Sequence, residues 1–217
     1  MSLAIRGGET LGLVGESGCG KTTLLQTLIT QIAPIGKLSG SISFNGKDIS
    51  NVNAGNIGFV SQQPDGQIVT DRVWSELAFG PENLGIKPDI IKGRIAEMSN
   101  YFGIQGWFHK STYELSGGQK QRVAVAVSMI CGKNLLVFDE PTSGLDFDSM
   151  AQVAGLIRRL SDMGKVIFIV THDFEFVCRT CSRVLHFDEG EMPDDVPVVM
   201  DALPKLRELF SVSDGKE

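Results

Sequence analysis

The sequence has no apolar run long enough to cross a membrane. A helix that spans a bilayer needs about 20 consecutive apolar residues, and no run among these 217 residues approaches that length. The first residues also lack the charged-then-apolar pattern of a secretion signal. We therefore expect a cytosolic protein, and any role at a membrane must come through a partner.

Clustered positive charge is scarce as well. The chain has 20 Lys and Arg residues against 26 Asp and Glu residues, a formal net charge of −6 at pH 7. Sequence-independent binding to DNA or RNA depends on clustered basic side chains, so we expect no nucleic-acid partner. Apolar residues make up 42% of the chain, which is ordinary for a folded globular protein.

Cysteine is also sparse, with Cys19, Cys131, Cys178 and Cys181 as the four positions. So few cysteines in a chain of this length do not predict a disulfide framework. Cys178 and Cys181 form one CxxC pair within an apolar helical pattern, without the second pair typical of a zinc site, so we expect ordinary helix packing there. Residues 1–14 contain no aromatic side chain that could stack on a base.

The most informative stretch is the run GESGCGKT, which follows an apolar strand-like segment and precedes a helical pattern. This is the setting of a phosphate-binding loop, because backbone N–H groups approach a triphosphate only where side chains are absent. Lys21 provides a charge for the β- and γ-phosphates, and Thr22 a hydroxyl for Mg²⁺. The alternative is a glycine-rich turn that binds nothing. The expected nucleotide-binding residues are Gly15, Glu16, Ser17, Gly18, Cys19, Gly20, Lys21, Thr22 and Thr23. We expect thiol modification of Cys19 to block nucleotide binding.

Two acids follow another apolar run. Residues 135–138 are LLVF, which predicts a strand buried on both faces, as in a parallel sheet. Asp139 and Glu140 come next, and acids at the end of a buried strand are costly unless a cation or a reaction uses them. We expect Asp139 to hold Mg²⁺ and Glu140 to act on a water molecule. His172 follows a second buried strand, residues 166–170, and should lie at the same end of the sheet.

The run LSGGQKQR lies before these strands, at residues 115–122. Ser116 is a predicted helix N-cap. The exposed amides of Ser116, Gly117 and Gly118 predict a second anion site at that helix start. Two glycines are costly there unless something approaches the backbone.

The remaining pattern alternates helices with strands. The segment 73–79 predicts a short helix that Gly80-Pro81 ends, and residues 90–102 predict another. A small antiparallel β part is expected at residues 40–45, followed by a turn at 46–48. Further expected elements are a strand at 57–60, an amphipathic helix that carries Met150, Val153, Ile157 and Leu160, a last strand at 184–187, a turn at 189–190 and a terminal helix at 203–210.

These pieces, in this order, resemble the nucleotide-binding domain of an ABC transporter. GESGCGKT is similar to the Walker A loop, LSGGQKQR to the ABC signature, LLVFDE to the Walker B strand with its catalytic glutamate, and SGLD to the D-loop. Gln62 resembles the Q-loop glutamine and His172 the switch histidine. VSQQPDGQ, LAFGPENLG and HFDEG look most like the ATPases of energy-coupling factor importers for vitamins and metal ions.

The resemblance implies that ATP and Mg²⁺ bind between two such domains arranged head to tail. One Walker A loop and the Ser116, Gly117 and Gly118 of the opposite domain would hold each ATP, and Asp146 would link the two sites. The implied catalytic residues are Glu140, His172, Lys21 and Gln62, and the implied metal ligands are Thr22, Gln62 and Asp139. The expected partners are a transmembrane subunit and a second ATP-binding domain, which is an identical copy, a paralogue or a fused half. The expected location is the cytoplasmic face of the cell membrane.

The expected fold is an α/β P-loop NTPase core with a mostly parallel sheet, a small antiparallel β part and a helical subdomain, as in ABC ATPases. The core would comprise residues 1–70 and 133–192, the helical subdomain with the signature 71–132, and a C-terminal tail with a short helix 193–217. Family members begin with further strands that bear an adenine-stacking aromatic residue. We therefore expect an N-terminally truncated domain that binds ATP more weakly than an intact one.

Two other functions stay open. ATPases of this kind also serve DNA maintenance and translation, but the repair enzymes separate the Walker motifs by long coiled coil, and no heptads lie between them here. A non-hydrolysing interaction module is disfavoured because the Walker residues, both acids and the histidine are all present. The main expectation is an ATPase that energises import of a vitamin or metal ion through a separate membrane subunit.

Overall fold

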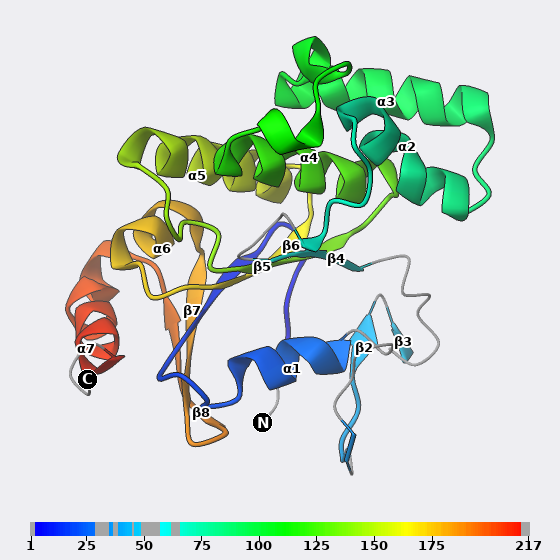
Figure 1. The fold of residues 1–217 in the computed structure, drawn as a ribbon. Coiled ribbons are helices and arrows are strands. Elements are labelled where there is room, and N and C mark those ends of the chain that lie inside the picture. The colour runs from blue at the N-terminus through cyan, green and yellow to red at the C-terminus, as the bar shows by residue number, and fades with distance from the viewer. Residues whose placement is uncertain are drawn as a thin grey trace.

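The computed structural model describes residues 3–28, 35–36, 39–44, 46–48, 57–61 and 66–213, with side chains as far as residue 211. Within these residues a six-stranded sheet has the order β4-β5-β6-β1-β7-β8 (Figure 1). The strands are β1 (Thr10–Val14), β4 (Ile57–Val60), β5 (Leu135–Asp139), β6 (Val166–Val170), β7 (Arg183–Asp188) and β8 (Glu191–Pro197). All neighbours pair in parallel except β7 and β8, which are antiparallel. The expected α/β fold with a mostly parallel sheet is confirmed.

Alternate residues of each strand belong to two different cores, one on each face of the sheet. Leu136 and Phe138 of β5 pack with the helices α4 (Gly117–Ile130), α5 (Phe147–Asp162) and α6 (Phe174–Thr180). Leu135 and Val137 pack on the other face with Leu25 of α1 (Lys21–Leu28). This double burial explains why the strands are continuous apolar runs. In Figure 1 α4 and α5 lie above the sheet and α1 lies below it.

A helical part packs beside α4 and contains α2 (Val73–Asn83) and α3 (Pro88–Phe102). Short 3₁₀ turns follow at Gln105–Trp107 and Thr112–Glu114. The predicted helix over 90–102 is confirmed, with its start two residues earlier at Pro88.

The predicted break at Gly80-Pro81 is wrong, because α2 continues through both residues. Pro81 removes one donor from the helix, but the amide of Leu84 still donates to the carbonyl of Gly80 at 3.2 Å. A Cβ at Gly80 would lie 2.8 Å from the Sγ of Cys131. The glycine therefore allows α2 to pack closely against the end of α4 rather than ending the helix.

The small antiparallel β part is confirmed as β2 (Ser43–Phe44) and β3 (Lys47–Asp48). Lys47 and Asp48 pair with β2, so they belong to a strand and not to the predicted turn at 46–48. No helix among the described parts of the chain is both long and apolar enough to cross a membrane.

Strand β8 is absent from the sequence prediction, and it crosses residue 193, where the sequence predicts the C-terminal tail to begin. Its prolines and acids disfavour a strand, but an edge position tolerates proline, and side-chain ion pairs hold β8 in place. Arg183 of β7 donates to both carboxylate oxygens of Asp195 at 2.8 Å.

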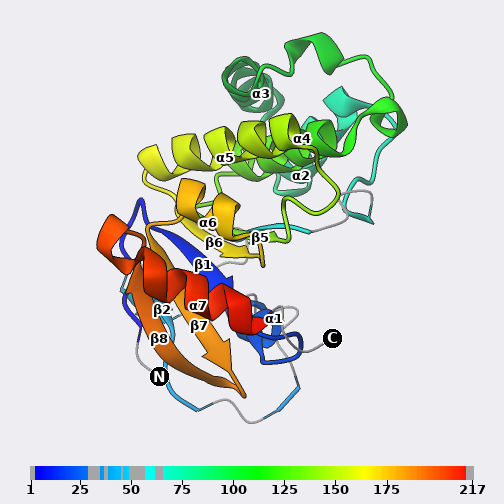
Figure 2. The same cartoon turned by 90° about the vertical axis from the view of Figure 1, so that its left-hand side faces the viewer.

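Helix α7 (Leu203–Ser213) follows a 3₁₀ turn at Met200–Ala202 and lies along β7 and β8 (Figure 2). Lys205 of α7 bonds to Asp194 of β8, and this hydrogen bond holds the pKa of Asp194 below its usual value. The predicted terminal helix is thus confirmed. It bonds to β8, the strand that the sequence prediction missed.

Candidate functional site

Three chain segments leave the sheet at the carboxyl ends of its strands, because β1 and β5 both pair in parallel with β6. Leu13 of β1 and Asp139 of β5 both pair with Val170 at the end of β6. The loop after β1, the acids after β5 and the histidine after β6 therefore begin side by side. The structure brings together the groups that the sequence predicts at one end of the sheet.

The loop after β1 is packed against the end of β7. Gly15 has a φ of 142°, and a Cβ there would lie 2.1 Å from the carbonyl oxygen of Phe187. The carbonyl of Cys19 accepts a hydrogen bond from the amide of Gly190 at 3.1 Å. Helix α1 begins at Lys21, as predicted. The contacts with Phe187 and Gly190 therefore constrain the backbone conformation of the loop.

Lys21 extends over this loop. Its Nζ donates to the carbonyl oxygens of Gly15 and Glu16, each at 2.7 Å, and lies 3.5 Å from the Sγ of Cys19. Ser17, Gly18, Thr22 and Thr23 are exposed, and Gly20 is half-buried. An ammonium group, a helix start and exposed hydroxyls therefore surround one loop, a donor set that suits a polyphosphate.

Cys19 offers a test of this loop, because the residue is only 9% exposed and its Sγ lies next to the Nζ of Lys21. We expect methyl methanethiosulfonate to block ATP binding once it modifies Cys19, and ATP to slow that modification. The Cys131→Ser and Cys178→Ser substitutions together restrict the reaction to Cys19, because burial raises the pKa of Cys181 to about 12 and keeps its thiol protonated. Full ATP binding after stoichiometric modification would contradict the prediction.

Glu140 has an unusual backbone and an unsatisfied side chain. Its φ is 47°, a left-handed conformation that is strained for a residue with a Cβ. Its amide donates to the carbonyl of Val170 at 2.9 Å, and its Oε1 lies 3.1 Å from the Nδ1 of His172. Its Oε2 is buried and has no hydrogen-bond partner among the residues that the structure describes. A buried carboxylate oxygen without a donor is costly, so this atom points to a donor that binds with the substrate, such as a water molecule.

Asp139 lies next to this strained residue and is half-buried. Burial raises the pKa of its carboxyl above the usual value, and the charge of Lys21 partly opposes this rise. Asp139 and Lys21 therefore interact electrostatically across the strand ends. A half-buried carboxylate is an oxygen ligand that suits a hard cation such as Mg²⁺.

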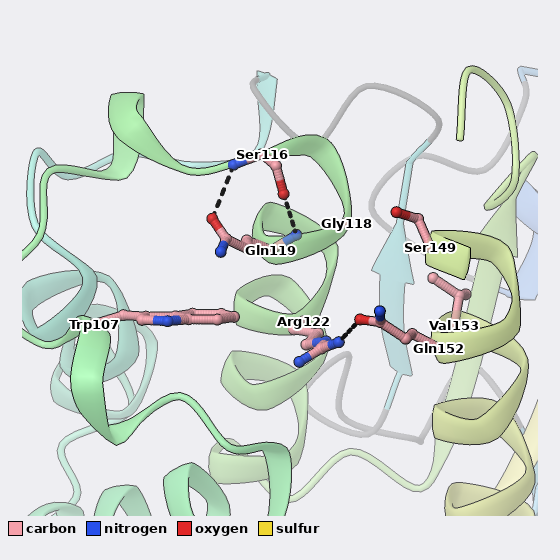
Figure 3. Close-up of a pocket in the computed structure, with 8 residues that line it drawn as sticks. All are labelled: Trp107, Ser116, Gly118, Gln119, Arg122, Ser149, Gln152 and Val153. Atoms are coloured by element: carbon pink, nitrogen blue, oxygen red, sulfur yellow. Dashed lines mark hydrogen bonds between the residues drawn. The ribbon is translucent and has the colours of Figure 1, made fainter. Parts of the chain in front are cut away.

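Ser116 begins α4 with a capping box. Its Oγ accepts from the amide of Gln119 at 3.4 Å, and the Oε1 of Gln119 accepts from the amide of Ser116 at 3.0 Å (Figure 3). Ser116 and Gly117 are exposed. The predicted N-cap is confirmed, and the side chain of Gln119, which the sequence prediction leaves out, completes it.

A cavity of about 240 Å³ lies beside this helix start, between α4 and α5 (Figure 3). Its lining consists of Trp107, Ser116, Gly118, Gln119, Arg122, Ser149, Gln152 and Val153. Arg122 bonds to Gln152, and its guanidinium lies 5.9 Å from the centre of the Trp107 ring. The nearest side chain to a Cβ at Gly117 belongs to Leu145, and that to a Cβ at Gly118 belongs to Ser149. The signature residues thus neighbour the segment that leads into α5.

Asp146 is the N-cap of α5. Its Oδ1 accepts from the amide of Ser149 at 2.7 Å, and this bond holds the pKa of Asp146 below its usual value. Its side chain is exposed. The structure therefore places Asp146 at a helix start beside the signature residues. Gln62 lies outside the described residues.

Sequence reasoning missed Gln121, which joins α4 to the residue after Glu140. Its Nε2 donates to the carbonyl of Pro141 at 2.7 Å, and the residue is 4% exposed. Its Oε1 is buried, and no described residue donates a hydrogen bond to it. A glutamine on the mostly apolar buried face of this helix is the signal that could have identified it.

Comparison with known proteins gives a consistent family. The family model for the ABC transporter matches residues 1–143. A putative ABC transporter ATP-binding protein of Treponema denticola is 42% identical over 195 residues, which cover 88% of this chain and 38% of the relative. A similar protein of Bacillus cereus is 39% identical over 210 residues, or 94% of this chain and 37% of that protein. The chain spans well under half the length of these curated relatives.

Two further matches are proteins whose names place them in transporters. The energy-coupling factor transporter ATP-binding protein EcfA2 of Methanospirillum hungatei is 36% identical over 198 residues, covering 88% of this chain and 49% of that protein. The solved structure of cbiO1 from Clostridium perfringens, part of the ABC transporter complex cbiONQ, matches with a TM-score of 0.83 at 28% identity. That match covers 99% of this chain and 90% of the other.

Proposed function

This chain belongs to the ABC transporter family of ATP-binding proteins, and on that premise we propose that it binds and hydrolyses ATP to drive import through a separate membrane subunit. Proteins of this family hydrolyse ATP. The observation that carries the proposal is the strand-end cluster, where a fixed phosphate loop, Lys21, Asp139 and the unsatisfied Glu140 lie together.

The residues divide the work of hydrolysis by position. The loop amides and Lys21 hold the β- and γ-phosphates, and Glu140 Oε2 accepts a hydrogen bond from the attacking water. His172, 3.1 Å from the other oxygen of Glu140, orients that carboxylate and contacts the γ-phosphate. Thr22, Asp139 and Gln62 would hold Mg²⁺. That ion, when bound, offsets the charge of the phosphate oxygens.

The exposed start of α4 supports the involvement of a second ATP-binding domain. Ser116 and Gly117 present a helix N-terminus to solvent, and helix N-termini attract phosphate. In a head-to-tail pair, Ser116, Gly117 and Gly118 of one domain complete the nucleotide site of the other, and Asp146 lies near that junction. The second domain is a copy of this chain, a paralogue or another part of a longer protein.

The similarity to EcfA2 and to cbiO1 supports an importer of the energy-coupling factor kind. Its cargo would be a vitamin or a metal ion, and the protein would lie at the cytoplasmic face of the membrane, held by its membrane subunit. The competing function is an ABC-type ATPase of translation or DNA maintenance.

Purification from native cells separates these functions. A tagged chain isolated from detergent-solubilised membranes should bring down a polytopic membrane protein, and Mg²⁺-ATP hydrolysis should be present in that complex. Recovery with ribosomes or chromosomal DNA, and no membrane protein, would overturn the transport assignment. The Lys21→Ala variant serves as the control, since it should keep the partner and lose hydrolysis.

A further inference from the structure

Two segments that are distant in the sequence pair side by side at the edge of the helical part. The amides of Val73 and Trp74 donate to the carbonyls of Lys110 at 3.3 Å and Phe108 at 3.1 Å. An antiparallel bridge joins Arg72 to Ser111. The first segment follows the edge strand β4, and the second leads directly into the signature helix. This pairing is a physical connection between the two.

Thr112 is buried and joins the two segments by hydrogen bonds. The residue is 1% exposed, and its Oγ1 donates to the carbonyl of Thr70 at 2.7 Å, across 42 positions of sequence. Its amide donates to the carbonyl of Asp71 at 3.0 Å. Thr112 opens the 3₁₀ turn that ends immediately before Leu115 and Ser116. The position of Thr70 therefore determines where the turn before the signature begins.

Glu76 holds Thr70 from the other side. Its Oε2 accepts from the amides of Val69 at 3.1 Å and Thr70 at 2.8 Å, and from the hydroxyl of Thr70 at 2.9 Å. The Glu76 residue is only 6% exposed. A buried carboxylate with three donors forms strong, directional bonds, so Thr70 is held rigidly against α2.

Gln67 connects the same segment to the sheet. Its Nε2 donates to the carbonyl of Phe59 at 3.0 Å, and its Oε1 accepts from the amide of Ser61 at 3.0 Å. These are the bonds that a further strand would make at the edge of β4. Val60 pairs with Phe138, the residue before Asp139. The connection therefore starts at the carboxyl end of the sheet, close to Asp139.

We propose that Thr112 and Glu76 are positioning residues that fix Ser116 relative to the carboxyl end of the sheet, where Asp139 and Glu140 lie. Gln67 bonds to the end of β4, and Thr70 bonds to Thr112 in the turn before Ser116. The short backbone segment between Gln67 and Thr70 joins these two sets of hydrogen bonds. This inference rests on the proposed function. It concerns the distance, within one chain, between the phosphate loop of one nucleotide site and the Ser116 segment that completes the site of the second domain. Neither residue belongs to the phosphate loop, so the affinity of a single chain for ATP should not depend on them.

The test compares three threonine variants. Thr112→Val removes the hydroxyl at nearly constant volume, and Thr112→Ser restores it. Thr180→Val is the matched control, because the hydroxyl of Thr180 makes a similar buried bond to the carbonyl of Phe176 at 2.7 Å in α6. We expect Thr112→Val to lower kcat roughly threefold to tenfold, the factor that one hydrogen bond represents. The Kd for ATP should change less than about twofold.

The controls separate positioning from stability. Thr112→Ser should recover most of kcat, and Thr180→Val should keep kcat even where its Tm falls as far as that of Thr112→Val. Glu76→Gln provides a second variant, with the same expected loss of kcat and unchanged Kd. Unchanged kcat in Thr112→Val and Glu76→Gln, or equal losses in Thr112→Val and Thr180→Val, would overturn the inference. A wild-type chain that binds no ATP would instead overturn the proposed function, and the inference with it.

Discussion

The Glu140→Gln variant is expected to hydrolyse ATP roughly 10²–10⁴-fold more slowly than the wild type, with ATP binding retained. Glutamine keeps the size of the side chain but loses the negative charge, so the group can no longer attract a proton from water. Glu140 does not belong to the phosphate loop, and Lys21 bonds to the carbonyl oxygens of Gly15 and Glu16 within that loop, so the nucleotide should still bind. Single-turnover hydrolysis and equilibrium binding of ATP measure the two effects separately.

The matched control is Glu97→Gln, a change of the same chemistry at an exposed position of α3. It should leave both hydrolysis and binding unchanged. If Glu140→Gln turned over ATP at the wild-type rate, then another group would activate the water. The buried, unsatisfied Oε2 of Glu140 would then lack the role assigned to it.

The Gly15→Ala variant is expected to lose stability in the absence of any ligand. Its Cβ would lie 2.1 Å from the carbonyl oxygen of Phe187, and its φ of 142° is one that an L side chain rarely adopts. Either the loop or the end of β7 must move, and we expect a cost of roughly 3 kcal/mol in the free energy of unfolding. In a chain of this size this corresponds to a fall in Tm of roughly 6–12 °C.

Gly18→Ala isolates the contribution of the backbone conformation. Gly18 has a φ of 82°, but a Cβ there meets no atom of the described part of the chain within 4 Å. We expect only the conformational cost of about 1–2 kcal/mol, and thus a smaller fall in Tm. Equal thermal shifts for the two variants would show that the contact with Phe187 does not constrain the loop.

Much of the sheet could be predicted because its signals are local. The strands β5 and β6 are buried on both faces, so they appear in the sequence as uninterrupted apolar runs, and the residues that follow them lie at a shared edge. The same reasoning predicted that His172 would lie at the same end of the sheet as Glu140, and the structure places the Nδ1 of His172 3.1 Å from the Oε1 of Glu140.

The missed elements depend on contacts between distant residues. Strand β8 has poor strand propensity and depends on pairing with β7, including the Arg183–Asp195 ion pair. Helix α2 continues through Pro81 because packing against α4 outweighs one lost hydrogen bond. Gln121 and Thr112 acquire their roles only through the carbonyls of Pro141 and Thr70. Neither composition nor periodicity contains this information.

The most direct measurement is a crystal structure of the Glu140→Gln chain grown with ATP and Mg²⁺. We expect the β- and γ-phosphates within hydrogen-bond distance of the backbone amides of residues 15–22 and of Lys21, with the metal ion between Thr22 and Asp139. A nucleotide bound elsewhere, for example in the cavity between α4 and α5, with the loop after β1 left empty, would contradict the proposed site.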